Sequence, residues 1–87
     1  MQAHEICQKA AALIKGDRQR QHGDKHEHFG NVARLWSAWL ATDISAADVA
    51  AMMVLLKLAR TKTGELNTDD FVDACGYSAC MGEVLND

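Results

Sequence analysis

Apolar residues recur at helical spacing along almost the whole chain. In the first segment Ala3, Ile6, Ala10 and Leu13 follow one another at intervals of three or four residues, which places them on one face of a helix. Gly16 comes after this stripe, at a position where helices commonly end. The pattern therefore predicts a first helix that ends just before Gly16.

A polar stretch separates the first helix from the second. Residues 17–25 (DRQRQHGDK) have no apolar period and contain Gly23, which is typical of a loop. From about residue 26 to residue 41 apolar side chains again form a wide helical face. Trp36 and Trp39 belong to that face, and we expect both of them in the core.

The third predicted helix is apolar around most of its circumference. Ser45 and Asp48 have the spacing of a capping box at its start. Lys57 and Arg60 suit the negative end of the helix dipole, and Gly64 follows as a terminator. Such a helix belongs at the centre of the domain or in a subunit interface, so we expect a homo-oligomer.

A last helix completes the predicted architecture. Asn67 or Thr68 caps it, and Asp69 and Asp70 stand favourably in its first turn. The sequence therefore predicts an all-α fold, a compact bundle of about four helices in a single domain over residues 1–87.

Composition narrows the class of protein. Apolar residues make up 48% and charged residues 24% of the chain, which is ordinary for a globular domain. No apolar run approaches the roughly 20 residues of a membrane span, and the N-terminus has no signal-type segment. We therefore expect a cytoplasmic protein, in the host cytoplasm if a phage encodes it, with no membrane partner. The cysteines, Cys7, Cys75 and Cys80, are odd in number and form no C-x-x-C pair, so we expect buried thiols rather than disulfides or zinc ligands.

The net charge of −3 is unevenly distributed. Basic residues and histidines crowd residues 15–28, whereas no basic side chain follows Lys62. A basic loop and an acidic last helix suggest local binding of an anion and a cation. They do not provide the broad positive face of a nucleic-acid-binding protein.

Asp70 and Asp73 are the first candidate site residues. They lie three residues apart on one helix face, where two like charges repel unless something neutralises them. Mg²⁺ could do so, since it takes one or two carboxylates together with substrate phosphates. The alternatives are direct contact with a ligand, or a structural role in which Asp73 pairs with Arg60 or Lys57.

The polar loop is the second candidate. Arg18 and Arg20 carry planar guanidinium groups suited to phosphate, and Gly23 would let backbone amides approach an anion closely. His22 lies beside them as a candidate ligand-binding ring or general base. The alternative is an ordinary solvated surface loop.

Two further positions complete the candidate set. Lys57 and Arg60 share a helix face, from which they could clamp a phosphate or balance Asp70 and Asp73. Tyr77 follows Gly76 inside the last helix. A glycine followed by tyrosine inside a helix is typical of a place where another backbone packs against the glycine and the tyrosine hydroxyl can form a hydrogen bond.

The order of these motifs resembles a family of small phage-encoded proteins of unassigned function. The resemblance covers nearly the whole chain and rests on Arg18–Gly23, Phe29, Leu35-Trp36, Met53–Arg60 and Asp69–Tyr77. His22 stands where that family usually has tyrosine.

A more distant resemblance is to the all-α NTP pyrophosphatases of the MazG type. It implies an oligomeric bundle that binds Mg²⁺ and cleaves nucleoside triphosphates, with Asp70 and Asp73 as metal ligands. The E-E-x-x-E motif of those enzymes is missing here, and only Asp24 and Glu27 are acids near the second helix. A site with half its carboxylates would hold Mg²⁺ weakly and activate water poorly.

Three functions therefore remain open. The first is a phage-type protein that binds and sequesters a nucleotide, such as a cyclic nucleotide immune signal, without hydrolysing it. The second is a Mg²⁺-dependent pyrophosphohydrolase of MazG-like type, in which Glu27 or His22 would help to activate water. The third is a small inhibitor that binds a host protein through its acidic last helix.

Overall fold

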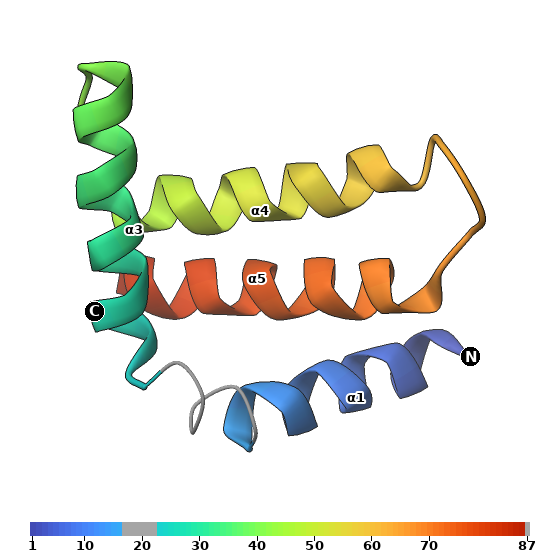
Figure 1. Ribbon diagram of the computed structural model, residues 1–87. Coiled ribbons are helices and arrows are strands. Elements are labelled where there is room, and N and C mark those ends of the chain that lie inside the picture. The colour runs from blue at the N-terminus through green and yellow to red at the C-terminus, as the bar shows by residue number, and fades with distance from the viewer. Residues whose placement is uncertain (17–22, 87) are drawn as a thin grey trace.

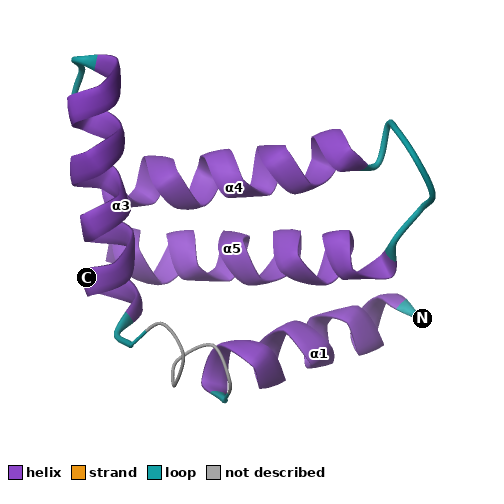
Figure 2. Ribbon diagram, in the orientation of Figure 1, coloured by secondary structure: helices purple, strands orange, loops and turns teal. Residues whose placement is uncertain are grey.

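The computed structural model describes residues 1–16 and 23–86. These residues form four helices, which are drawn in Figure 1 and coloured as helix in Figure 2. They contain no strand, so the predicted all-α class is confirmed. The helices are α1 (Ala3–Lys15), α3 (Lys25–Leu40), α4 (Ala46–Arg60) and α5 (Thr68–Asn86).

Local hydrogen bonds explain where the last two helices begin. The Ser45 hydroxyl accepts from the Asp48 amide at 3.0 Å, and the Asp48 carboxylate accepts from the Ser45 amide at 3.0 Å. This reciprocal pair is the predicted capping box. The Asn67 side chain accepts from the Asp69 amide at 2.9 Å, so Asn67, one of the two candidates, caps α5.

The helix ends follow the sequence with two corrections. α1 stops at Lys15 as predicted, but Gly16 has φ −106° and is not in the left-handed conformation of a typical terminating glycine. α3 begins at Lys25, one residue earlier than expected, and Ala41 with φ 54° takes the left-handed position after its end.

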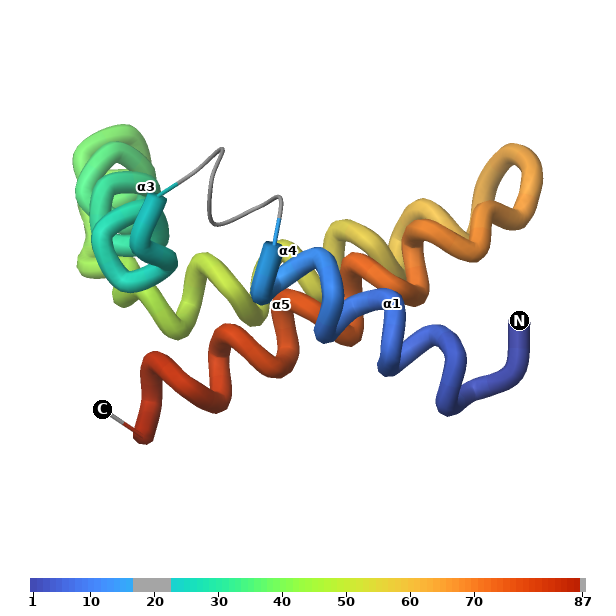
Figure 3. Tube along the Cα trace, turned by 90° about the horizontal axis from the view of Figure 1, so that it is seen from below, coloured from blue at the N-terminus to red at the C-terminus, as the bar shows by residue number. Residues whose placement is uncertain are grey.

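α4 and α5 form an antiparallel pair around which the other helices are placed. α5 lies between α4 and α1 (Figure 1), and the view from below shows α1 running along α5 (Figure 3). α3 stands across one end of the pair, and its last turns project past α4 on the side away from α5 (Figure 1).

The core lies where α3 crosses the pair. Phe29 and Ala33 of α3 pack with Val49 and Ala50 of α4, all at most 6% exposed. Tyr77 of α5 is among the partly buried side chains around this cluster. The fully buried residues are mostly small, which is what a chain of 87 residues can assemble.

The prediction that both tryptophans are in the core is wrong for one of them. Trp36 packs against the core, whereas Trp39 is 88% exposed. The reason is geometric, because the last turns of α3 extend beyond the helices that could cover them (Figure 1). Leu35, at 71% exposed, shares this situation.

The cysteines and the helix lengths complete the description. All three thiols are free, as expected, but Cys7 is exposed rather than buried, while Cys75 and Cys80 are half-buried. No helix within the described residues combines the length and the apolar character that crossing a bilayer requires.

Candidate functional site

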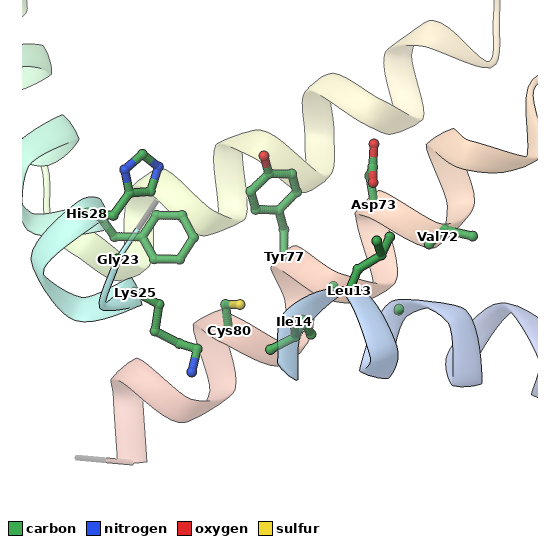
Figure 4. A pocket seen from close by; sticks show the side chains of 12 residues that line it. Leu13, Ile14, Gly23, Lys25, His28, Val72, Asp73, Tyr77 and Cys80 are labelled. Atoms are coloured by element: carbon green, nitrogen blue, oxygen red, sulfur yellow. The ribbon is translucent and has the colours of Figure 1, made fainter. Parts of the chain in front are cut away.

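A pocket of about 140 Å³ opens where α1, α3 and α5 meet (Figure 4). Apolar side chains of all three helices line part of it, and a smaller polar group lines the rest. This mixture of an apolar body with few polar groups is the usual character of a small-molecule site. The lining residues are Ala10, Leu13, Ile14, Gly23, Lys25, His28, Phe29, Val72, Asp73, Gly76, Tyr77 and Cys80.

The apolar part is built by the approach of α1 to α5. A methyl group added at Gly76 would lie 3.8 Å from a side-chain carbon of Ile14, so the helices are close at this point. The neighbour of Gly76 is therefore a side chain of α1, not another backbone as the Gly-Tyr step suggested. Phe29 supplies a second wall, and its ring meets that of Tyr77 edge-on with centroids 6.2 Å apart.

The polar part lies along α5 and the start of α3. The Tyr77 hydroxyl and the Asp73 carboxylate point the same way, toward α4, and the ring of His28 stands on the α3 side of them (Figure 4). These three groups give the pocket hydrogen-bonding atoms along one side, above the apolar residues Leu13 and Ile14.

The acidic and basic candidates face one another between α4 and α5. Lys57 Nζ lies 3.2 Å from Asp73 Oδ2, and both side chains are only 15% exposed. Arg60 Nε lies 3.5 Å from Asp70 Oδ1, with the Asp70 side chain 7% exposed. Of the two cations considered for Asp73, the structure selects Lys57, and Arg60 takes Asp70 instead.

These ion pairs decide how well the described residues fit a magnesium ion. Each of the two candidate carboxylates already has a cation beside it. Within residues 1–16 and 23–86 there is no group of three or more His, Cys, Asp or Glu side chains that could hold a metal. As arranged, Asp70 and Asp73 therefore fit a divalent cation poorly, since it would have to displace Lys57 and Arg60.

The mouth of the pocket carries a second charged cluster. Lys25 Nζ lies 3.0 Å from Glu83 Oε2, and His26 Nε2 lies 3.4 Å from the same oxygen. The hydrogen bond to Glu83 raises the pKa of Lys25, so this ammonium stays charged throughout the physiological range. Asp24 caps α3 by accepting from an amide of its first turn, which fixes Lys25 at the start of the helix.

Sequence reasoning missed three of these residues. Lys25 was part of the basic cluster and Glu83 part of the acidic last helix, but no spacing rule joins residues that are so far apart in the chain. Phe29 belongs to the apolar face predicted for the second helix and is buried in the core, and its ring also forms a wall of the pocket.

The loop candidates are only partly covered by the structure. Arg18, Arg20 and His22 lie outside the described residues. Gly23 is described and lines the pocket with φ +72°, a left-handed conformation that glycine adopts without strain.

Comparison with known sequences shows the family to which the chain belongs. Residues 5–85 match the domain of unknown function DUF6378. The chain belongs to the DUF6378 family. The resemblance to a small phage protein family of unassigned function is thereby confirmed, since the relatives it matches come from phages.

Two Gene 55 proteins illustrate the family. That of Mycobacterium phage D29 is 37% identical over 82 residues, which cover 94% of this chain and 54% of the relative. That of Mycobacterium phage L5 is 35% identical over 80 residues, which cover 91% of this chain and 51% of the relative. The DUF6378 chain thus spans about half the length of the curated relatives it matches. No solved structure matches it.

Proposed function

We propose that this DUF6378 chain binds a phosphorylated nucleotide and sequesters it without hydrolysis. The observation that carries the proposal is the pocket between α1, α3 and α5, which combines an apolar body, two aromatic walls and a charged mouth.

The size of the pocket suits a nucleobase rather than a whole nucleotide. At roughly 30 Å³ for each water molecule in the liquid, 140 Å³ has room for about five waters, which is closer to one small ring system than to a whole nucleotide. The edge-on rings of Phe29 and Tyr77 offer an aromatic surface beside it. The Tyr77 hydroxyl and the Asp73 carboxylate would bond to the polar edge of the base or to a ribose hydroxyl.

The phosphates would then lie at the mouth, outside the apolar body. Lys25, which also pairs with Glu83, supplies an ammonium group there that a phosphate would share with that carboxylate. The open backbone of Gly23 allows an anion to approach closely. We assign Arg18 and Arg20 to the same anion, on the basis of the sequence. Lys57 and Arg60 hold Asp73 and Asp70 in place, so their contribution to binding is indirect.

Binding is better supported than turnover. The MazG-like alternative needs Asp70 and Asp73 as metal ligands, and in the structure each of them is balanced by a cation. The phage origin of the relatives favours a protein that captures a host nucleotide signal, with cyclic dinucleotides and cyclic ADP-ribose isomers as the first compounds to test.

The test is a capture experiment with the purified protein. The protein is mixed with Mg²⁺ and a pool of triphosphates, cyclic dinucleotides and cyclic ADP-ribose isomers, and the filtrate is chromatographed before and after the protein is denatured by heat. A compound that disappears and returns intact on heating supports sequestration. Conversion to new products would replace the proposal by the hydrolase, and an unchanged pool would overturn both and favour the host-protein inhibitor.

Two variants locate the bound compound. Tyr77→Phe removes a hydroxyl of the pocket while keeping the ring, and should weaken capture about tenfold if one hydrogen bond to the ligand is lost. Lys9→Met changes an exposed lysine on α1 that does not line the pocket, and should capture like the wild type. Equal capture by all three proteins would place the ligand elsewhere.

A further inference from the structure

The side of α4 that faces away from α5 is apolar and uncovered. Leu55 and Leu58, which we call the outer leucines, are 62% and 45% exposed and lie about 60° apart around the helix. Val49 and Ala50, by contrast, are at most 1% exposed and belong to the core. With 3.6 residues per turn, Leu55 lies on nearly the opposite side of the helix from Ala50. The expectation of a helix that is apolar around most of its circumference is met, but among the described residues no helix packs on the side that carries Leu55.

The projecting end of α3 adds to this surface. Its side chains Leu35, Trp39 and Leu40 are 71%, 88% and 55% exposed. The last turns of α3 extend past α4 on the side away from α5, which is also the side of the outer leucines (Figure 1). A body packed on the outer side of α4 would therefore also meet the projecting end of α3.

The area matches that of a stable interface. Taking roughly 120 Å² for a fully exposed leucine and 220 Å² for tryptophan, the two outer leucines and the three side chains of α3 expose on the order of 470 Å² of apolar surface. A standard protein interface buries about 800 Å² on each partner, a little more than half of it apolar. The exposed apolar area is therefore about what one partner of a standard interface buries.

The pattern of residues along α4 points to a second copy of the chain. Asp48, Leu55 and Lys62 are seven residues apart and so fall on one side of the helix and of the turn that follows it. If two α4 helices pack antiparallel about a two-fold axis at Leu55, Asp48 of each chain meets the partner subunit's Lys62. The small side chains Ala51 and Ala59 meet in the same way and allow close approach. A parallel arrangement would bring like charges together instead.

We propose that two copies of this chain form a symmetric dimer in which their α4 helices pack antiparallel through the outer leucines, with Leu55 at the two-fold axis. The projecting end of each α3 then covers the far end of the partner's α4. This interface goes beyond the proposed nucleotide site, which is lined by residues of α1, α3 and α5 and by none of α4, and neither depends on the other.

Size-exclusion chromatography with light scattering tests the dimer on the full chain. The wild type should have about twice the chain mass of 9.5 kDa. Leu55→Arg places two guanidinium groups against each other at the axis and should give the monomer mass. Leu85→Arg is the matched control, because Leu85 is 63% exposed but lies on α5, and it should remain a dimer. A monomeric wild type, or a dimeric Leu55→Arg, would overturn the proposal.

A cross-link checks the geometry independently of that variant. Under mild oxidation Leu55→Cys should form a covalent dimer through residue 55 on denaturing gels, whereas Leu85→Cys should resemble the wild type. If circular dichroism shows that Leu55→Arg does not fold, the cross-linking result tests the dimer in its place. A Leu55→Cys protein that does not cross-link through residue 55 would contradict an axis there.

Discussion

Two lysine–aspartate ion pairs of nearly equal length join α5 to its neighbours. Lys57 of α4 pairs with Asp73, and Lys9 of α1 pairs with Asp69. Comparing them isolates the effect of burial on the stability that an ion pair contributes. Lys57 Nζ lies 3.2 Å from Asp73, and Lys9 Nζ lies 3.3 Å from Asp69. Both side chains of the Lys57–Asp73 pair are 15% exposed, whereas Lys9 is 45% exposed and Asp69 is 64% exposed. Lys→Met at each position removes the charge and keeps an unbranched side chain, so the two variants differ mainly in the burial of the carboxylate left behind.

The expected difference follows from that burial. At about 3.2 Å the Coulomb energy is roughly 5 kcal/mol for an effective dielectric constant near 20, and little more than 1 kcal/mol in water. Breaking a fully buried pair costs about 3–5 kcal/mol because a charge is stranded, so at 15% exposure we expect about 2 kcal/mol for Lys57→Met. An exposed pair contributes about 0.2–1 kcal/mol, so Lys9→Met should cost less than about 1 kcal/mol.

Urea unfolding followed by far-ultraviolet circular dichroism measures both values. The proteins are compared at one concentration, because self-association adds to apparent stability. A cycle with Asp73→Asn isolates the pairwise energy, since the double variant strands no charge. Equal costs for Lys57→Met and Lys9→Met would show that the burial of Asp73 does not control the energy of the pair, and the reasoning would be refuted.

Two further predictions concern local features. Ser45→Ala should destabilise the fold by about 1 kcal/mol through loss of the α4 cap. The hydrogen bond from the Ser45 amide holds the pKa of Asp48 below its usual range. The wild type should therefore have a larger free energy of unfolding than Asp48→Asn above about pH 4, and this difference should vanish as the pH falls through that lowered pKa. A difference in unfolding free energy that persists at the acid limit would contradict the cap. The thiols of Cys7 and Cys75 lie 3.9 Å apart, and burial raises the pKa of Cys75. Diamide should therefore react first at the exposed Cys7, and the Cys75 thiol should then displace the reagent to form a Cys7–Cys75 disulfide. Two of the three titratable thiols should be lost, and the melting temperature should rise. Reaction at all three thiols, or a fall in melting temperature, would count against this pairing.

The sequence predicted the elements well because the signals for them are local. The capping residues Ser45 and Asp48, the apolar periods and the terminating positions lie within a few residues of one another, and each helix begins or ends close to where they stand. Trp39 shows where this reasoning fails. Periodicity identifies an apolar face, but whether a neighbour covers that face depends on where α3 crosses the other helices, which no local spacing encodes.

The candidate site was predictable by residue type more than by geometry. The sequence offered the pairing of Lys57 and Arg60 with the two aspartates as one alternative beside phosphate and metal binding, and the structure contains both ion pairs. The pocket was not foreseen as such. It depends on the packing of Ile14 of α1 against Gly76 and on the contact of Phe29 with Tyr77, which join residues 48 or more positions apart.

The central claim, that a nucleotide occupies the pocket between α1, α3 and α5, is tested most directly by amide nuclear magnetic resonance of the labelled protein with the captured compound. The account predicts that the amide signals of Gly76, Tyr77 and Gly23 shift on addition of the compound while those of the outer leucines on α4 do not. Shifts confined to α4, or no shift at Gly76 and Tyr77 at saturating compound, would contradict it.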